Sequence, residues 1–174
     1  MSKIKLNHCD FEFEIDELIP NSTIAKYKKF NHFLNIARNM SQFSDLHQYK
    51  LGAVIISKGK ILSKGYNSSK THPEQKKYNQ LRTNIDLDKT NHYLHAEFDA
   101  LRKAKNVSLK NAEMYIYHLN RCGEQKLARP CAGCMDAIKE HGIKMIHYST
   151  PDGFATEYLD PNKKIIVQKS KRPI

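Results

Sequence analysis

Apolar residues recur along the first third of the chain with two different periods, one typical of helices and one typical of strands. Between Ile24 and Phe43 they recur every three or four positions, which predicts a helix with one buried face, with Ser22 or Thr23 as its N-cap. The compact apolar run at 51–56 leads through a Lys-Gly pair into a second short apolar stretch. This pattern predicts a β-hairpin that ends at 65–67.

The rest of the chain alternates strand-like and helix-like segments. The pattern predicts two helices, at 94–105 and 131–141, with Gly142 stopping the second. It predicts strands at 113–119, 144–148 and 165–167, a turn at 150–153 and an edge strand or extended arm at 11–16. Residues 68–91 are polar and weakly periodic, so they are predicted to be a long functional loop. Strands alternating with helices indicate an α/β layered sheet.

The length of 174 residues suits one domain and is too short for two of ordinary size. We expect a single domain over 1–174, with 1–20 as an N-terminal arm and about 151–174 as a C-terminal extension. No apolar run reaches the roughly 18 residues that a membrane span needs, and no secretory signal is visible. The expectation is therefore a cytoplasmic protein without a membrane partner.

The net charge of +11 is unevenly spread, because residues 1–20 carry −3 and the remainder carries +14. A basic balance of this size is typical of proteins that meet phosphate, on a nucleotide or on a polymer. The lysines are scattered rather than striped, so a merely lysine-rich surface explains the charge equally well.

Two short motifs carry the chemistry of this sequence: His95-Ala96-Glu97, and Cys131-Ala132-Gly133-Cys134 after a proline. Each lies at the predicted start of a helix. Cys131 and Cys134 are three residues apart, so both thiols project from one face of a first helical turn, where the helix dipole favours thiolates. With His95 they make a three-ligand zinc site, and three protein ligands are typical of a catalytic rather than a structural ion.

Glu97 is placed differently from the three ligands, because it lies two residues beyond His95. A carboxylate there is suited to take a proton from the water that a zinc ion activates and to deliver it to a reacting base. The combination of H-x-E with a later P-C-x-x-C is the signature of zinc-dependent base deaminases.

On these motifs the sequence resembles the cytidine deaminase-like superfamily, and most of all its dCMP deaminase group, from about Leu51 to Tyr148. The resemblance implies a three-layer α/β/α sandwich with a five-stranded mixed sheet. It implies a Zn²⁺ cofactor, with Glu97 as the general acid and base. It also implies that Asn67 holds the sugar, and that the chain at Ala96 and Ala53 lines the base pocket.

The substrate implied by the resemblance is a small cytosine-containing (deoxy)nucleotide, with dCMP as one candidate, converted to its uracil form with release of ammonia. The chain departs from the dCMP deaminase pattern at Asp99, where Asn is usual, and in the segment 127–130 before the cysteines. The basic charge keeps a nucleic-acid base deaminase open as an alternative, acting on tRNA adenosine or single-stranded cytosine. A non-enzymatic, zinc-stabilised nucleotide-binding protein is a further alternative.

Two other interpretations of the His and Cys residues stay open. A structural zinc site would need a fourth ligand, which could come from His72, His92, His118 or Cys122. Cys9 and Cys122 are most simply small buried residues, and a second zinc site that includes them is the sharper alternative. The resemblance also implies a homo-oligomer, because pockets in this superfamily are often completed by a neighbouring subunit.

Overall fold

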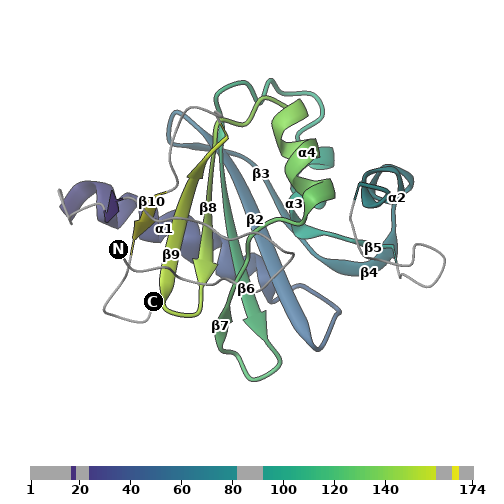
Figure 1. Cartoon of the computed structure of the whole chain (residues 1–174), viewed down its shortest axis with the longest axis horizontal. Coiled ribbons are helices and arrows are strands. Elements are labelled where there is room, and N and C mark those ends of the chain that lie inside the picture. Colours follow the sequence, from purple (N-terminus) through teal and green to yellow (C-terminus); the bar gives the residue numbers. More distant parts are fainter. Residues whose placement is uncertain (1–16, 19–23, 82–91, 160–165, 169–174) are drawn as a thin grey trace.

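A mixed β-sheet forms the centre of the computed structural model, which describes residues 17–18, 24–81, 92–159 and 166–168. Its five central strands follow the order β9-β8-β6-β2-β3 (Figure 1), namely β2 (Tyr49–Ser57), β3 (Lys60–Tyr66), β6 (Glu113–Asn120), β8 (Met145–Thr150) and β9 (Gly153–Tyr158). The β6–β8 pair is parallel, and the other pairs are antiparallel. The predicted five-stranded mixed sheet is therefore confirmed.

Short strands extend this sheet and form a second, smaller one. The extensions are β1 (Glu17–Leu18), β10 (Ile166–Gln168) and β7 (Gln125–Lys126), which pair with β10, β9 and β6 respectively. The second sheet joins β4 (Ser68–Thr71) to β5 (Tyr93–Leu94) in antiparallel fashion. The second sheet thus brings together the two described ends of the polar segment that follows the β2–β3 hairpin.

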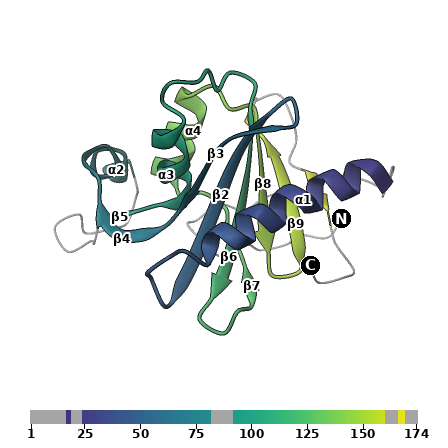
Figure 2. The same cartoon turned by 180° about the vertical axis from the view of Figure 1, so that it is seen from behind.

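Helices cover both faces of the central sheet, which makes the predicted three layers. Helix α1 (Ile24–Ser41) crosses one face, and α3 (Ala96–Lys103) and α4 (Ala132–Glu140) lie on the other, as Figures 1 and 2 show from opposite sides. Helix α2 (Pro73–Asn79) stands beside α4, next to the small β4–β5 sheet. Among the described helices, none is long and apolar enough to cross a membrane.

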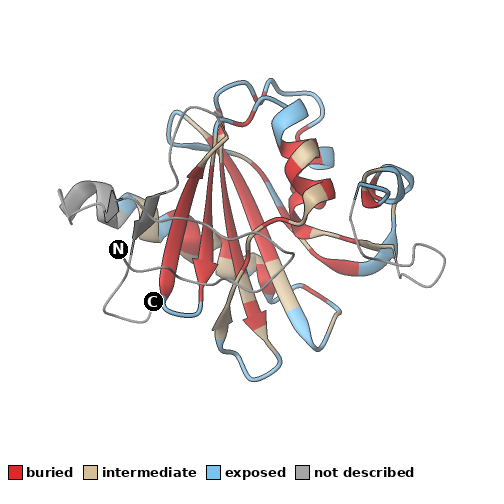
Figure 3. Cartoon of the chain, in the orientation of Figure 1, coloured by how far each residue is buried: buried red, intermediate tan, exposed pale blue. Residues whose placement is uncertain are grey.

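The core divides into two clusters because neighbouring residues of a strand point to opposite faces. On β2, Val54 and Ile56 pack under α1, whereas Ala53 and Ile55 face α3 and α4. The predicted apolar face of α1 is confirmed, since Phe33, Leu34 and Ala37 are buried in the same cluster as Val54 and Ile56 of β2. Burial therefore concentrates along the central strands and the inward faces of the helices (Figure 3).

The prediction of one long loop over 68–91 is wrong for its first part. Residues 68–79 form β4 and α2, and 82–91 lie outside the described residues. The helix predicted at 94–105 begins only at Ala96, because Leu94 belongs to β5.

The structure also adds a strand that the sequence pattern did not predict. Strand β9 follows the predicted turn and pairs with β8 along its whole length. The predicted strand near 165–167 is present as β10, at 166–168. The arm at 11–16, the N-cap candidates Ser22 and Thr23, and Cys9 lie outside the described residues.

Candidate metal centre and active site

The starts of two neighbouring helices hold the three predicted metal ligands. His95 is the N-cap residue of α3 and Cys131 is the N-cap residue of α4, while Cys134 lies in the first turn of α4. Gly65 of β3 lets α3 approach the sheet, because a Cβ at that position would lie 2.4 Å from the Ala96 carbonyl oxygen. The two motifs, 36 residues apart in the chain, therefore meet on one face of the sheet.

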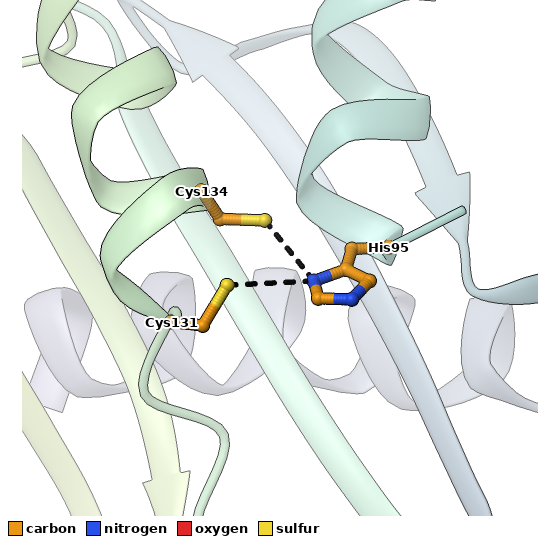
Figure 4. Close-up of side chains that lie close together, drawn as sticks. All are labelled: His95, Cys131 and Cys134. Atoms are coloured by element: carbon orange, nitrogen blue, oxygen red, sulfur yellow. Dashed lines mark hydrogen bonds between the residues drawn. The ribbon is translucent and has the colours of Figure 1, made fainter. Parts of the chain in front are cut away.

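The three side chains converge on one point (Figure 4). His95 Nδ1 lies 3.6 Å from Cys131 Sγ and 3.3 Å from Cys134 Sγ, and all three ligand atoms lie within 4.8 Å of one another. Ordinary zinc–sulfur and zinc–nitrogen bonds in a tetrahedron place such atoms about 3.5 Å apart. The donor set therefore fits zinc in both chemistry and spacing.

The two cysteine side chains influence each other's protonation. Interaction with Cys134, together with the His95 ring, holds the pKa of Cys131 well below its usual value, although burial opposes this. Interaction with Cys131 and burial raise the pKa of Cys134. Cys131 lies at the N-terminus of α4, where unpaired N–H groups stabilise negative charge. The position of Cys131 therefore suits the thiolate form that binds a metal ion.

Glu97 is 3% exposed and lies in the first turn of α3. Burial raises the pKa of Glu97; the His95 ring opposes this rise and the Cys131 sulfur adds to it. Its Oε2 has no hydrogen-bond partner among the described residues. A buried carboxylate oxygen without a protein partner is costly, so it indicates a group held ready for a water, a ligand or a proton.

The described part of the chain brings no further residue into the metal group. Among the described His, Cys, Asp and Glu side chains, the group consists of His95, Cys131 and Cys134. The four candidates for a fourth ligand do not join it, namely His72, His92, His118 and Cys122. Cys122 is exposed rather than buried, contrary to its simplest interpretation. Three protein donors are the number typical of a catalytic zinc ion.

The predicted substrate-binding residues lie near one another in the fold. Asn67 follows β3 and is buried, with Oδ1 accepting the Leu51 N–H at 2.7 Å and Nδ2 donating to the Tyr49 carbonyl at 2.9 Å. One hydrogen of its amide and one lone pair of its oxygen are left over from these two bonds. Ala53 and Ala96 are fully buried, in the cluster beneath α3 and α4. Their part in holding a base stays a prediction.

Asp99 shapes the same region, although the sequence pattern gave it no role. It is 1% exposed, accepts a hydrogen bond from the Tyr66 N–H at 3.2 Å, and pairs with Arg102 and Lys103. It thereby ties the end of β3 to α3, directly before Asn67. The sequence places Asp99 four residues after His95 and therefore on the predicted helix, but only the fold shows that it contacts the end of β3.

Arg129 holds the chain that leads to the cysteines. Its guanidinium makes two hydrogen bonds of 2.9 Å to the Glu157 carboxylate of β9, and both side chains are largely buried. The neighbouring Ala128 N–H also donates to the Ser149 carbonyl of β8 at 2.8 Å. The sequence showed only that the segment 127–130 departs from the dCMP deaminase pattern. It could not assign a partner to Arg129, because Glu157 lies on the strand that the pattern did not predict.

The match to a protein-family model agrees with this geometry. The family model described as the cytidine and deoxycytidylate deaminase zinc-binding region matches residues 27–150. No curated protein sequence matches the chain. Among solved structures, the chain is similar to a dCMP deaminase from the cyanophage S-TIM5, at 24% identity over 70% of this chain and 82% of that one, with a TM-score of 0.49. It is also similar to a cytidine deaminase from Mycobacterium leprae, at 16% identity over 73% and 92% of the two chains, with a TM-score of 0.47.

The family match covers well over half of the chain and includes both motifs. It spans α1 to β8, and so takes in the hairpin, α3 and α4 that build the site. The three donors can hold a zinc ion, and the buried Glu97 supplies a carboxylate that can transfer protons, as zinc-dependent deamination requires. The chain therefore belongs to the cytidine and deoxycytidylate deaminase zinc-binding family, and it is a zinc-dependent hydrolase that acts on the exocyclic amine of a nucleobase.

Proposed function

We propose that the chain converts a cytosine-containing (deoxy)nucleotide to its uracil form with release of ammonia, and that dCMP is the first candidate substrate. The observation that carries this proposal is the buried Glu97 carboxylate, whose Oε2 lacks a partner among the described residues, beside a three-donor metal group. The choice of base is supported by the description of the matching family, which names cytidine and deoxycytidylate.

In this proposal His95, Cys131 and Cys134 hold the zinc ion, which supplies Lewis-acid activation of a water molecule. Glu97 accepts a proton from the water, whose oxygen bonds to C4 of the base, and it delivers that proton to the ring nitrogen. Glu97 then accepts the second proton from the new C4 hydroxyl and delivers it to the amine, which leaves as ammonia as the C4–N bond breaks and the C4=O bond forms. One water is consumed and one ammonia is released, so the carboxylate returns to its starting state. A buried carboxylate with a raised pKa suits this task, because it must both take and give a proton near neutral pH.

The proposal assigns substrate contacts to three elements. The remaining donor and acceptor of Asn67 bind a sugar hydroxyl, and the chain at Ala53 and Ala96 borders the base. Lys70 on β4 and Lys76 and Lys77 on α2 are exposed and offer positive charge to a 5′-phosphate. Charge on this segment would discriminate a nucleotide from a nucleoside.

The test is an ammonia-release assay over cytosine and adenine nucleosides, their monophosphates and short oligonucleotides. We expect turnover with cytosine monophosphates, and a higher kcat/KM for dCMP than for deoxycytidine because the phosphate adds charge contacts. Turnover on oligonucleotides alone would overturn the proposal in favour of the polymer alternative, which the basic charge of the chain favours. A steep fall of affinity with salt would accompany that outcome.

Two variants separate the role of Glu97 from that of the metal ligands. Glu97→Gln keeps the size of the side chain but cannot accept the proton, so kcat should fall by about 10²–10⁴-fold or more while zinc stays bound. His95→Ala removes a donor and should lose zinc together with activity. Unchanged turnover in Glu97→Gln would refute the acid–base role, and undiminished zinc content in His95→Ala would refute the ligand set.

The organisation of the protein around this site is also a proposal. A single deaminase domain over 1–174 and a homo-oligomeric assembly stay predictions, which limited proteolysis and light scattering would check.

A further inference from the structure

A line of buried amide groups connects α2 to the segment that carries His95. Gln75 and Asn79 are both 0% exposed, although α2 is short and its residues Glu74, Lys76 and Lys77 are exposed. Gln75 and Asn79 are four residues apart, so they share the one face of the helix that points inward. This helix therefore buries a polar face.

Each side-chain amide atom of Gln75 and Asn79 has a partner. Gln75 Nε2 donates to Asn79 Oδ1 at 3.0 Å, and Asn79 Nδ2 lies 3.0 Å from His92 Nδ1. At the other end, Gln75 Oε1 accepts the backbone N–H of His95 at 3.1 Å. Burying an amide is costly unless it is hydrogen bonded, so this arrangement specifies one geometry strongly.

The line holds the chain before α3 at two points. His92 meets the Asn79 amide, and three residues later the His95 N–H meets the Gln75 carbonyl oxygen. His95 is the N-cap residue of α3, and its side chain makes no capping hydrogen bond. The orientation of its ring toward the cysteines thus depends on a backbone that Gln75 holds.

Helix α2 also contacts the helix that carries the cysteines. A Cβ on Gly133 would lie 2.4 Å from the Tyr78 carbonyl oxygen, so glycine permits this close approach of α2 to the first turn of α4. The Tyr78 hydroxyl donates a hydrogen bond to Glu140 at the other end of α4. Helix α2 therefore contacts α4 as well as the segment that leads into α3.

We propose that Gln75 is a positioning residue for the metal centre, and that α2, with Asn79 and His92, braces the site rather than forming only a substrate-facing loop. This inference rests on the proposed metal ligands and adds a residue that holds them. Groups behind the ligands of a metal orient those ligands, and their removal typically lowers metal affinity by about 10- to 100-fold.

The test compares three variants of the full chain with wild type. Gln75→Met keeps the length of the side chain but leaves the His95 N–H without its acceptor. Gln75→Asn keeps the amide but is one methylene too short to reach. Gln80→Met is the matched control, because it makes the same change at the exposed C-cap residue of the same helix. Zinc affinity is measured by competition with a chelator, and the ligand geometry by the thiolate-to-metal absorption bands of the cobalt(II)-substituted protein.

We expect both Gln75 variants to lose zinc affinity by about 10- to 100-fold and to shift the cobalt bands, while Gln80→Met matches wild type. Wild-type affinity with unshifted bands in either folded Gln75 variant would overturn the proposal, even if thermal stability fell, because Gln75 would then serve packing alone. Gln75→Asn decides the question if Gln75→Met does not fold. A wild-type chain that bound no zinc would instead refute the proposed metal site itself.

Discussion

The Arg129–Glu157 pair offers a quantitative test of how the segment before the cysteines is held. The two side chains are only 16% and 11% exposed, and two hydrogen bonds of 2.9 Å join them. Replacing Arg129 with Met leaves the Glu157 carboxylate buried without its cation, and Glu157→Leu leaves the guanidinium without its anion. Removing one partner of a buried pair typically costs about 3–5 kcal/mol, and the remaining exposure places the expected loss near the low end, at about 3 kcal/mol.

The double variant Arg129→Met/Glu157→Leu should be more stable than either single variant. It leaves no buried charge, and apolar side chains of similar volume often replace a buried ion pair at little cost. The free energy of unfolding is measured from urea denaturation of all three variants. Glu124→Gln is the control, because the Lys126–Glu124 pair at 3.0 Å is exposed and should contribute nothing measurable.

Two outcomes would refute this reasoning about the buried pair. Single-variant losses below about 1 kcal/mol would mean that water compensates the unpaired charge, as at a surface pair. Additive losses in the double variant would mean that the two side chains contribute independently, and that charge pairing is not what holds the segment.

Two further predictions concern a buried histidine and an exposed cysteine. Burial lowers the pKa of His147 below its usual 6.5, although Glu113 opposes this. Below that pH the unfolded chain binds a proton at His147 more readily than the folded chain does. The free energy of unfolding should therefore fall as the pH drops below about 6.5. His147→Phe should flatten this part of the stability–pH curve from urea denaturation, and an unchanged slope would assign the effect to other groups. Cys122 is exposed and outside the described metal group, so Cys122→Ser should leave the zinc content measured by atomic absorption unchanged; a loss of metal would revive the second-site alternative.

The elements predicted correctly are those with a strong hydrophobic pattern. Helix α1 buries Phe33, Leu34 and Ala37 at helical spacing, so its period states which residues face the core. Strand β2 was predicted from a compact apolar run, and the run is apolar throughout because both faces of this strand are buried. The inward face of α2 could not be predicted in this way. Its two buried residues, Gln75 and Asn79, are amides, and a pattern of apolar positions does not include them.

Strand β9 was missed for a different reason. Its residues Gly153–Tyr158 are mixed in polarity, and five of the six are buried, including Thr156 and Glu157. A strand whose polar residues are buried against partners on other elements lacks the alternation by which a half-exposed strand is recognised. Glu157 is buried because Arg129 meets it, and that pairing exists only in the folded chain.

The sequence by itself determined which side chains can serve as donors to a metal ion. The spacing of Cys131 and Cys134 places both sulfurs on one helical turn, and His95 with Glu97 supplies the third donor and a carboxylate, because these relations act over a few residues of local structure. Only the tertiary structure decided that the two motifs meet, and that Gln75 and Arg129 hold the segments that carry them. Such contacts join residues from 20 to 39 positions apart, and they depend on how the sheet and helices pack.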